Sequence, residues 1–222
     1  MKINWKPTII TAAVATAVIA GAAIYGLVNQ NNTRVAAEER GGGSVAVVRD
    51  DSHVLDEAGA DAVTVVEFLD FECEACGAYY PVVEDLRLKY EGQINYVVRY
   101  FPLPGHINSE TSAVAAEAAA RQGRFEEMYK RLFETQSQWG ESQQSQAELF
   151  RSYATELGLD MAAYDEAVAD PTTLERVRSD LEDGRVLGVD RTPTFFVDGE
   201  PLIIERWNDL ENAITTRLDG TP

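Results

Sequence analysis

The sequence predicts an α/β fold whose strands are interrupted by a long helical segment and preceded by one transmembrane helix. Strand-like apolar runs lie at 63–70, 93–100 and 192–205, and residues 108–188 between them contain almost only helix signals. The third observation is an uncharged apolar run at residues 8–28, which predicts the transmembrane helix.

The charge balance argues against one class of partner. The 222 residues include 37 acidic and 19 basic side chains, which gives a net charge of −18. Because lysines and arginines form no cluster in the sequence, no nucleic-acid partner is expected. The length allows one domain of moderate size with an appendage.

Residues 1–28 are expected to form a cytoplasmic start and a transmembrane anchor. The run from Thr8 to Val28 is uncharged, and at ~1.5 Å per residue it is about long enough to cross a ~30 Å hydrocarbon layer. Lys2 and Lys6 precede it, so the N-terminus stays in the cytoplasm and the rest lies outside. A cleaved signal peptide is the alternative, but its apolar core is normally only ~7–15 residues long. The sequence favours a single-pass protein of the cell membrane.

A flexible polar tether is expected at residues 29–44, N-Q-N-N-T-R-V-A-A-E-E-R-G-G-G-S. The domain that follows, at 45–218, contains both cysteines of the chain. A location outside the cytoplasm is one in which paired cysteines form disulfides. The membrane segment and the cysteine count therefore indicate the same oxidising compartment independently.

The two cysteines, Cys73 and Cys76, lie where a buried strand gives way to a helix. The apolar run 63–68 precedes them, and apolar residues with helical spacing follow at Tyr79, Val82, Val83, Leu86 and Tyr90. A thiolate in the first turn of a helix is stabilised by unpaired N–H groups and the helix dipole, so its pKa falls. A cysteine one turn further on can resolve a mixed disulfide. We interpret Cys73 as the attacking thiol and Cys76 as the resolving one.

Two structural interpretations of the pair compete with this redox interpretation. A disulfide across two residues closes a very small loop and stabilises a fold little. A zinc site usually needs four ligands, and the other candidates, His53 and His106, lack zinc-finger spacing. No metal or cofactor is therefore expected. His53, a lone histidine in a polar loop, is assigned no role.

Two titratable residues near the pair are left with two interpretations each. Glu67 stands within the apolar strand, where a buried carboxyl group with a raised pKa would serve as a proton store under the cysteines. The position of Glu67 fits an exposed acid at the end of the strand equally well. His106 follows the proline-broken segment F-P-L-P-G-H at 101–106, and close to the cysteines it would favour the thiolate. As an ordinary loop histidine it would have no such effect.

The first half of the domain is expected to form a strand–helix–strand unit. A short strand, V-A-V-V-R at 45–49, comes before the main strand, and the helix behind the cysteines runs to about Lys89. The strand at 93–100 is then expected to pair in parallel with the main strand, through a right-handed crossover.

The second half is expected to contain the insert and a hairpin. Residues 108–188 form one packed insert of about four helices. The runs T-P-T-F-F-V at 192–197 and P-L-I-I-E at 201–205 flank Asp198-Gly199, a strong hairpin signal. A terminal helix is expected at 208–218.

Four segments together resemble the DsbA-like branch of the thioredoxin fold. They are E-F-L-D-F-E-C-E-A-C-G, F-P-L-P-G-H, A-A-E-A-A-A-R-Q-G-R-F-E-E-M-Y-K-R-L-F and G-V-D-R-T-P-T-F-F-V-D-G, and the resemblance covers about residues 45–218. It implies a thioredoxin fold with an inserted helical domain, which matches the insert at about 108–188.

The resemblance also implies site residues and partners. Cys73 would be the exposed nucleophile and Cys76 its buried partner, and Glu67 would be the family's buried acid. Pro193 would match the family's cis-proline, and Thr192 before it would face the cysteines and offer its backbone to the substrate. The implied partners are exported proteins with cysteines, together with a quinone-linked membrane protein that reoxidises the pair.

The dipeptide between the cysteines departs from the family. Strongly oxidising members resemble C-P-H-C, whereas here the pair encloses Glu74 and Ala75. The negative charge of Glu74, with Asp70 and Glu72 nearby, is expected to raise the thiol pKa and so to weaken the oxidant. The leading hypothesis is a membrane-tethered oxidase of middling potential that forms disulfides in exported proteins. The alternatives are a disulfide reductase or isomerase, a chaperone-like binding module, and a structural domain fused to a membrane partner.

Overall fold

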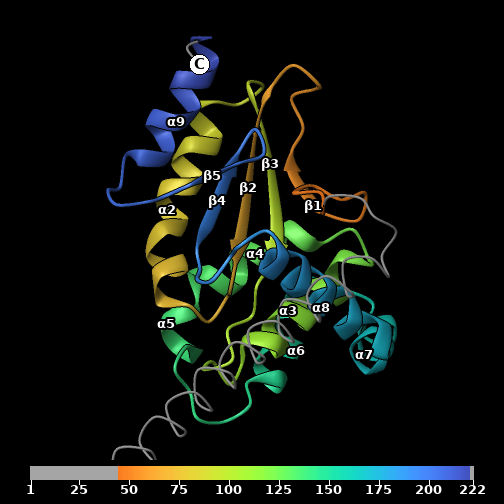
Figure 1. Ribbon diagram of the computed structural model, residues 1–222. Helices are drawn as coiled ribbons and strands as arrows, with labels where there is room; N and C mark the ends of the chain where they lie inside the picture. The colour runs from red at the N-terminus through yellow and green to blue at the C-terminus, as the bar shows by residue number, and fades with distance from the viewer. Residues whose placement is uncertain (1–44, 221–222) are drawn as a thin grey trace, which may run out of the picture. The chain divides into compact units, whose positions relative to one another are not determined.

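The computed structural model describes residues 45–220 (Figure 1). The expected anchor at 1–28 and tether at 29–44 lie outside these residues. Within the described range, every helix is too short or too polar to cross a lipid bilayer.

A five-stranded mixed sheet forms the centre of the described part. Its strands are β1 (His53–Asp56), β2 (Val63–Leu69), β3 (Ile94–Tyr100), β4 (Thr194–Val197) and β5 (Glu200–Leu202). Their order is β1-β3-β2-β4-β5, with β2 and β3 parallel and the other neighbours antiparallel. β2 is central, as its run of apolar residues on both faces predicts.

The two faces of β2 contact different helices. Val65 and Leu69 belong to the larger core, which includes residues of α2 (Glu74–Lys89) and α9 (Asp209–Leu218). Val66 and Phe68 belong to a second, smaller core that Leu181 of α8 (Pro171–Val186) also packs against. Figure 1 shows α2 and α9 side by side on one side of the sheet. The strand is therefore covered on both faces, and an acid within it is buried.

The insert between β3 and β4 contains six helices where about four were expected. They are α3 (Ser109–Ala120), α4 (Phe125–Glu134), α5 (Gln136–Trp139), α6 (Ala147–Glu156), α7 (Met161–Ala169) and α8. The four residues of α5 are too few to give a periodic pattern. The boundary between α7 and α8 follows from Asp170, whose side chain caps α8 by accepting from the N–H of Thr172.

Two expectations for the N-terminal part of the domain are wrong. Residues 45–49 do not form a strand, because the carbonyls of Ala46 and Val47 accept hydrogen bonds from the Arg99 side chain instead (3.1 and 3.2 Å). His53 is not solvated in a loop but belongs to β1. Its Nε2 lies 2.8 Å from a carboxyl oxygen of Glu117, so it ties β1 to the insert.

A buried ion pair joins the insert to the sheet. Arg99 of β3 is fully buried and donates to Asp180 of α8 at 2.5 and 2.8 Å, and to Asp183 at 2.7 Å. Buried charges persist in a fold only with partners of this kind. The pair fixes α8 against the sheet, and α8 leads directly to the segment before β4.

Candidate active site

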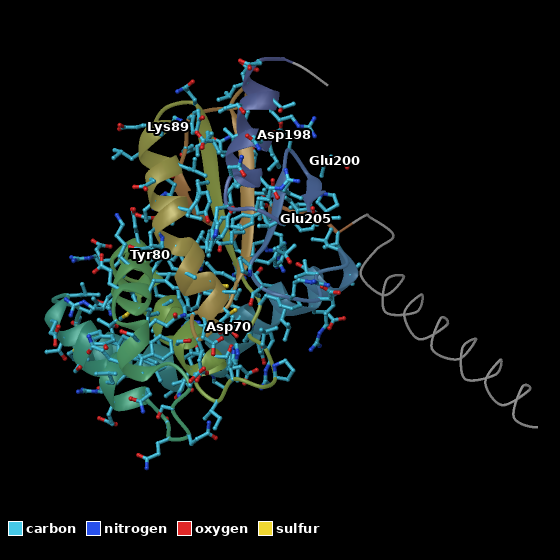
Figure 2. The ribbon with its side chains drawn as sticks, turned by 90° about the vertical axis from the view of Figure 1, so that its left-hand side faces the viewer. Asp70, Tyr80, Lys89, Asp198, Glu200 and Glu205 are labelled. Atoms are coloured by element: carbon cyan, nitrogen blue, oxygen red, sulfur yellow. The ribbon has the colours of Figure 1, made fainter. Side chains whose placement is uncertain are left out.

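The cysteines lie at the turn that joins β2 to α2. Cys73 is the N-cap residue of α2, with extended backbone (φ −68°, ψ 120°). The Asp70 carboxylate stabilises the turn by accepting from the N–H of Glu72 at 2.9 Å. Figure 2 labels Asp70 at the beginning of α2, near the inserted helices and at the opposite end from Asp198 and Glu200. The predicted position of the pair, between a strand and a helix, is confirmed.

Both cysteines are reduced and buried, with exposed fractions of 5% for Cys73 and 1% for Cys76. The exposed Cys73 that the family resemblance implied is therefore not found. Its Sγ lies 3.5 Å from the carbonyl oxygen of Thr192, across the site. The segment before β4 covers the thiol, because β4 pairs with β2 and Thr194 stands opposite Phe68.

The two thiols differ strongly in acidity. A hydrogen bond from the Cys76 thiol lowers the pKa of Cys73 to about 6, helped by Thr192 and by the N–H groups of Cys76 and Ala75, although burial opposes them. Burial raises the pKa of Cys76 well above its ordinary value, and the negative charges of Cys73 and Glu67 raise it further. At neutral pH the first thiol is a thiolate and the second is protonated.

The expectation that acidic neighbours raise the Cys73 pKa is wrong, because two of these acids are paired with other groups. Glu72 accepts a hydrogen bond from the N–H of Asn108 at 2.6 Å. The Asp70 carboxylate lies 2.6 Å from a ring nitrogen of His106.

Glu74 is exposed, and its carboxylate takes part in a hydrogen bond with the Glu141 carboxyl group. This bond lowers the pKa of Glu74 and raises that of Glu141. The Glu74 charge therefore faces solvent and a second carboxyl group, where water screens it from the thiolate.

Glu67 is buried beneath the pair, with an exposed fraction of 2%. Tyr96 on the neighbouring strand donates a hydrogen bond to its carboxyl group. Burial raises the pKa of Glu67 to about 7, and the Cys73 charge adds to the rise while the Tyr96 bond opposes it. The alternative of an exposed acid at the strand end is thus wrong.

His106 is held at the site by an ion pair. Its hydrogen bond with Asp70 raises its pKa to about 9, and the charges of Cys73 and Glu72 contribute to the rise. The ring is therefore cationic at neutral pH. Of the two interpretations left open for His106, the structure supports the one in which it lies near the cysteines. Its partner Asp70 could not be identified from sequence.

The segment before β4 supplies the opposite wall of the site. The peptide bond between Thr192 and Pro193 is cis. The Thr192 hydroxyl is buried and, among the described residues, has no hydrogen-bond partner in the reduced protein. The hydroxyl is therefore free to donate a hydrogen bond to the Cys73 thiolate, and Thr192 is one of the residues that lower the pKa of Cys73.

A groove of about 390 Å³ begins beside this wall. Its lining residues come from α2, the segment before β4 and the segment before α9: Ala75, Ala78, Tyr79, Arg191, Thr192, Pro193, Ile204, Glu205, Arg206 and Trp207. Trp207 is 60% exposed, and its ring stacks on Tyr79 with centroids 5.4 Å apart. Sequence reasoning missed Trp207, because it stands in an irregular segment without a periodic pattern or motif.

No group of three or more histidine, cysteine and acidic side chains between residues 45 and 220 is arranged to hold a metal ion. The groups at the site that can exchange electrons or protons include the two thiols, Glu67 and His106.

The comparison with protein families decides where the chain belongs. A family model described as thioredoxin matches residues 52–216, which is most of the chain. The chain belongs to the thioredoxin family. Its C-x-x-C pair and the helices inserted between its strands give it a thioredoxin fold of DsbA-like architecture.

Solved structures agree with the DsbA-like architecture. The chain is similar to α-DsbA1 of Wolbachia pipientis, with a TM-score of 0.69, 19% identity and coverage of 81% of this chain and 98% of that one. It is also similar to MdbA, a thiol-disulfide oxidoreductase from Corynebacterium diphtheriae, with a TM-score of 0.63, 22% identity and coverage of 77% and 92%. At these identities the likeness concerns the fold alone.

The curated relatives are larger proteins. The chain is 41% identical over 138 residues to Na(+)/H(+) antiporter NhaA 3 of Salinispora tropica, which covers 62% of this chain and 20% of that protein. It is 36% identical over 153 residues to Na(+)/H(+) antiporter NhaA 1 of Mycobacterium sp. strain KMS, which covers 67% and 24%. The chain thus spans about a quarter or less of the length of these relatives.

Proposed function

We propose that the protein is an extracytoplasmic oxidase that forms disulfides in exported proteins through Cys73 and Cys76. The observation that supports this best is the difference in acidity between the two thiols. The pKa of Cys73 is about 6, whereas that of Cys76 is raised well above its ordinary value. A thiol of low pKa is the better leaving group, so the pair passes its disulfide to a client rather than keeping it.

The reaction begins when a client thiolate attacks Sγ of Cys73 in the oxidised pair. The bond between the two cysteines breaks, and its electron pair goes to Sγ of Cys76, which takes up a proton. A second client thiolate then attacks the client sulfur of the mixed disulfide, and Cys73 leaves as a thiolate. The client has lost two electrons, which the protein has gained. Of the two thiol protons of the client, the equivalent of one is on Cys76, and the other stays in solution because Cys73 leaves as a thiolate.

Glu67 would supply the proton that Cys76 takes up. Its pKa of about 7 means that the carboxyl group holds a proton about half of the time at neutral pH. Its charge also acts on Cys76, whose pKa it raises. A buried acid of this kind is suited to proton transfer in a site that is closed to bulk water.

The groove beside Pro193 would hold an extended client segment. It is largely apolar and begins at Ala75, next to the nucleophile, and Thr192 would offer its backbone to the client chain. The exposed ring of Trp207 would pack against an apolar client side chain near the reacting cysteine.

We further propose that residues 8–28 tether the domain to the outer side of the cell membrane. A quinone-linked membrane partner would then reoxidise the pair after each transfer. The support for this part is the uncharged run and the lysines before it, together with the need of any such oxidase for an electron acceptor.

The reduction potential of the pair tests the direction of the reaction. A Cys73 pKa of about 6 lies between those of thioredoxin, ~7, and DsbA, ~3.5. We therefore expect equilibration with glutathione to give a potential between about −270 and −120 mV. A value at or below the thioredoxin end would instead indicate a reductase.

The chaperone-like alternative is tested with Cys73→Ser. The oxidase hypothesis predicts that this variant no longer forms disulfides in a reduced, unfolded client protein. A binding module would protect the client from aggregation equally well with and without the thiol.

A second candidate client is a membrane antiporter, since the curated relatives carry this domain within Na(+)/H(+) antiporters. A Cys76→Ser variant retains the attacking thiol but cannot resolve the mixed disulfide, so it traps clients covalently. Trapped secreted proteins would support the oxidase of exported proteins. A trapped ion antiporter would support the second candidate.

A further inference from the structure

The side chain of Gln136, on the inserted helix α5, binds the backbone at the start of α2. Its Nε2 donates hydrogen bonds to the carbonyl oxygens of Phe71 and Cys73, at 2.7 and 2.8 Å. Both partners are acceptors, so only the NH₂ end of the amide fits between them. Gln136 therefore connects the turn before the nucleophile to an element more than sixty residues away in the sequence.

Gly77 makes this contact possible. A Cβ atom at Gly77 would lie 1.9 Å from Oε1 of Gln136 and 2.7 Å from its Cδ, so any other residue would displace the amide. The backbone of Gly77 is helical and is not among the glycines with positive φ. Alanine would suit the helix better than glycine, so the reason for glycine here is space and not conformation.

The element that carries Gln136 is itself firmly held. Trp139, at the other end of α5, is buried, and its ring packs edge-on against Phe150 with centroids 4.8 Å apart. The Trp139 indole N–H donates to the carbonyl of Leu132 at 3.2 Å. A side chain on such an element can fix the position of a backbone group that it binds.

We propose that Gln136, reaching over Gly77, is a positioning residue that fixes the backbone of Cys73 and so aims the first N–H groups of α2 at its sulfur. The Cys73 carbonyl that Gln136 binds also accepts the first helical bond, from the N–H of Gly77 at 3.0 Å. Holding this carbonyl fixes the peptide planes that follow, and these carry the N–H groups of Ala75 and Cys76. Both N–H groups are among those that stabilise the thiolate.

This inference rests on the proposed role of Cys73 as the nucleophile and adds the group that prepares it. Without Gln136 the turn could rotate, and the N–H groups would lose their alignment with the sulfur. The thiolate would then be less stable, while the fold, which does not depend on this bond, would persist.

The test is the acidity of Cys73 in the reduced, full-length chain, followed by thiolate ultraviolet absorbance. Gln136→Met keeps the length of the side chain but removes both donors, and Gly77→Ala displaces the amide from the α2 side. We expect each to raise the Cys73 pKa, and a rise of one unit would lower the thiolate fraction at pH 6 about fivefold. Titration is the better readout, because a more basic thiolate is also more nucleophilic and exchange rates partly hide the change.

The double variant separates a shared contact from two unrelated effects. If both residues act through one contact, the variant with both changes titrates like the more affected single variant. Shifts that add up, or single variants that titrate like the unchanged protein, would overturn the proposal. Gln138→Met is the matched control, since Gln138 lies exposed on the same short helix, and it should leave the titration unchanged.

The two variants also protect the test against misfolding, since each reaches the contact from a different element. Circular dichroism identifies a variant that has lost its fold. The Cys73 titration of the other variant then tests the proposal. If the unchanged protein itself has no thiol of low pKa, the role of Cys73 fails. If it has one and the variants keep it, only the role of Gln136 fails.

Discussion

Replacing Glu67 by glutamine removes a buried acid but keeps the size of the side chain and an oxygen that accepts the hydrogen bond from Tyr96. The change therefore isolates the effect of the charge. Glu67 is fully enclosed, with an exposed fraction of 2%, so solvent screens its charge little.

The expected effect on stability follows from the shifted pKa. Burial raises the pKa of Glu67 from 4.5 to about 7, and a pKa unit corresponds to ~1.4 kcal/mol, so the ionised acid costs about 3 kcal/mol at high pH. The folded state binds this proton more tightly than the unfolded chain does. The contribution of Glu67 to the free energy of unfolding is thus highest below pH 4.5. It decreases as the pH rises to about 7 and is constant above that.

Urea unfolding of the reduced protein at two pH values measures this effect. Between about pH 5.5 and 8, the unchanged protein should lose roughly 2 kcal/mol of unfolding free energy relative to Glu67→Gln. At pH 8 the variant should be the more stable of the two. Glu91→Gln, a change at an exposed glutamate, is the matched control and should follow the unchanged protein.

The same variant tests the proton-transfer role. Disulfide transfer to a client should slow toward ~100-fold, the lower range for lost acid–base catalysis. Equal pH dependence of stability in the variant and the unchanged protein would refute the buried, neutral acid. If the pH-dependent difference in stability between Glu67→Gln and the unchanged protein is as expected but the rate of disulfide transfer is unchanged, only the catalytic role of Glu67 is refuted.

Three further predictions concern the rest of the site and the fold. The His106 ring is cationic below about pH 9, so His106→Asn should raise the pKa of Cys73, which thiolate absorbance would measure. An unchanged titration would mean that the His106 charge does not stabilise the thiolate. Trp207→Ala should raise KM for an unfolded client with little change in kcat, and steady-state kinetics that showed the reverse would place the client elsewhere. Arg99→Met should lower the free energy of unfolding by about 3 kcal/mol in a urea titration, because Asp180 and Asp183 lose the buried cation that they share; a loss below about 1 kcal/mol would mean that the contact of Arg176 with Asp180 is sufficient.

Much of the architecture could be predicted from the sequence because the signals are local. The apolar run of β2, the helical spacing behind Cys76 and the Asp198-Gly199 turn each lie within a few residues, and the corresponding elements are confirmed. The four-residue α5 gave no such signal. The strand expected at 45–49 failed because a distant side chain, that of Arg99, took its hydrogen-bonding groups.

The sequence by itself determined the thioredoxin-type order of elements and the position of the cysteine pair at a helix start. Only the tertiary structure decided the acidity of the pair. Glu74 adjoins Cys73 in sequence, yet the groups that set the pKa of Cys73 include Thr192, more than a hundred residues away. Hydrogen bonds and burial act through space, so charges close in the sequence were a poor guide to a site that distant segments complete.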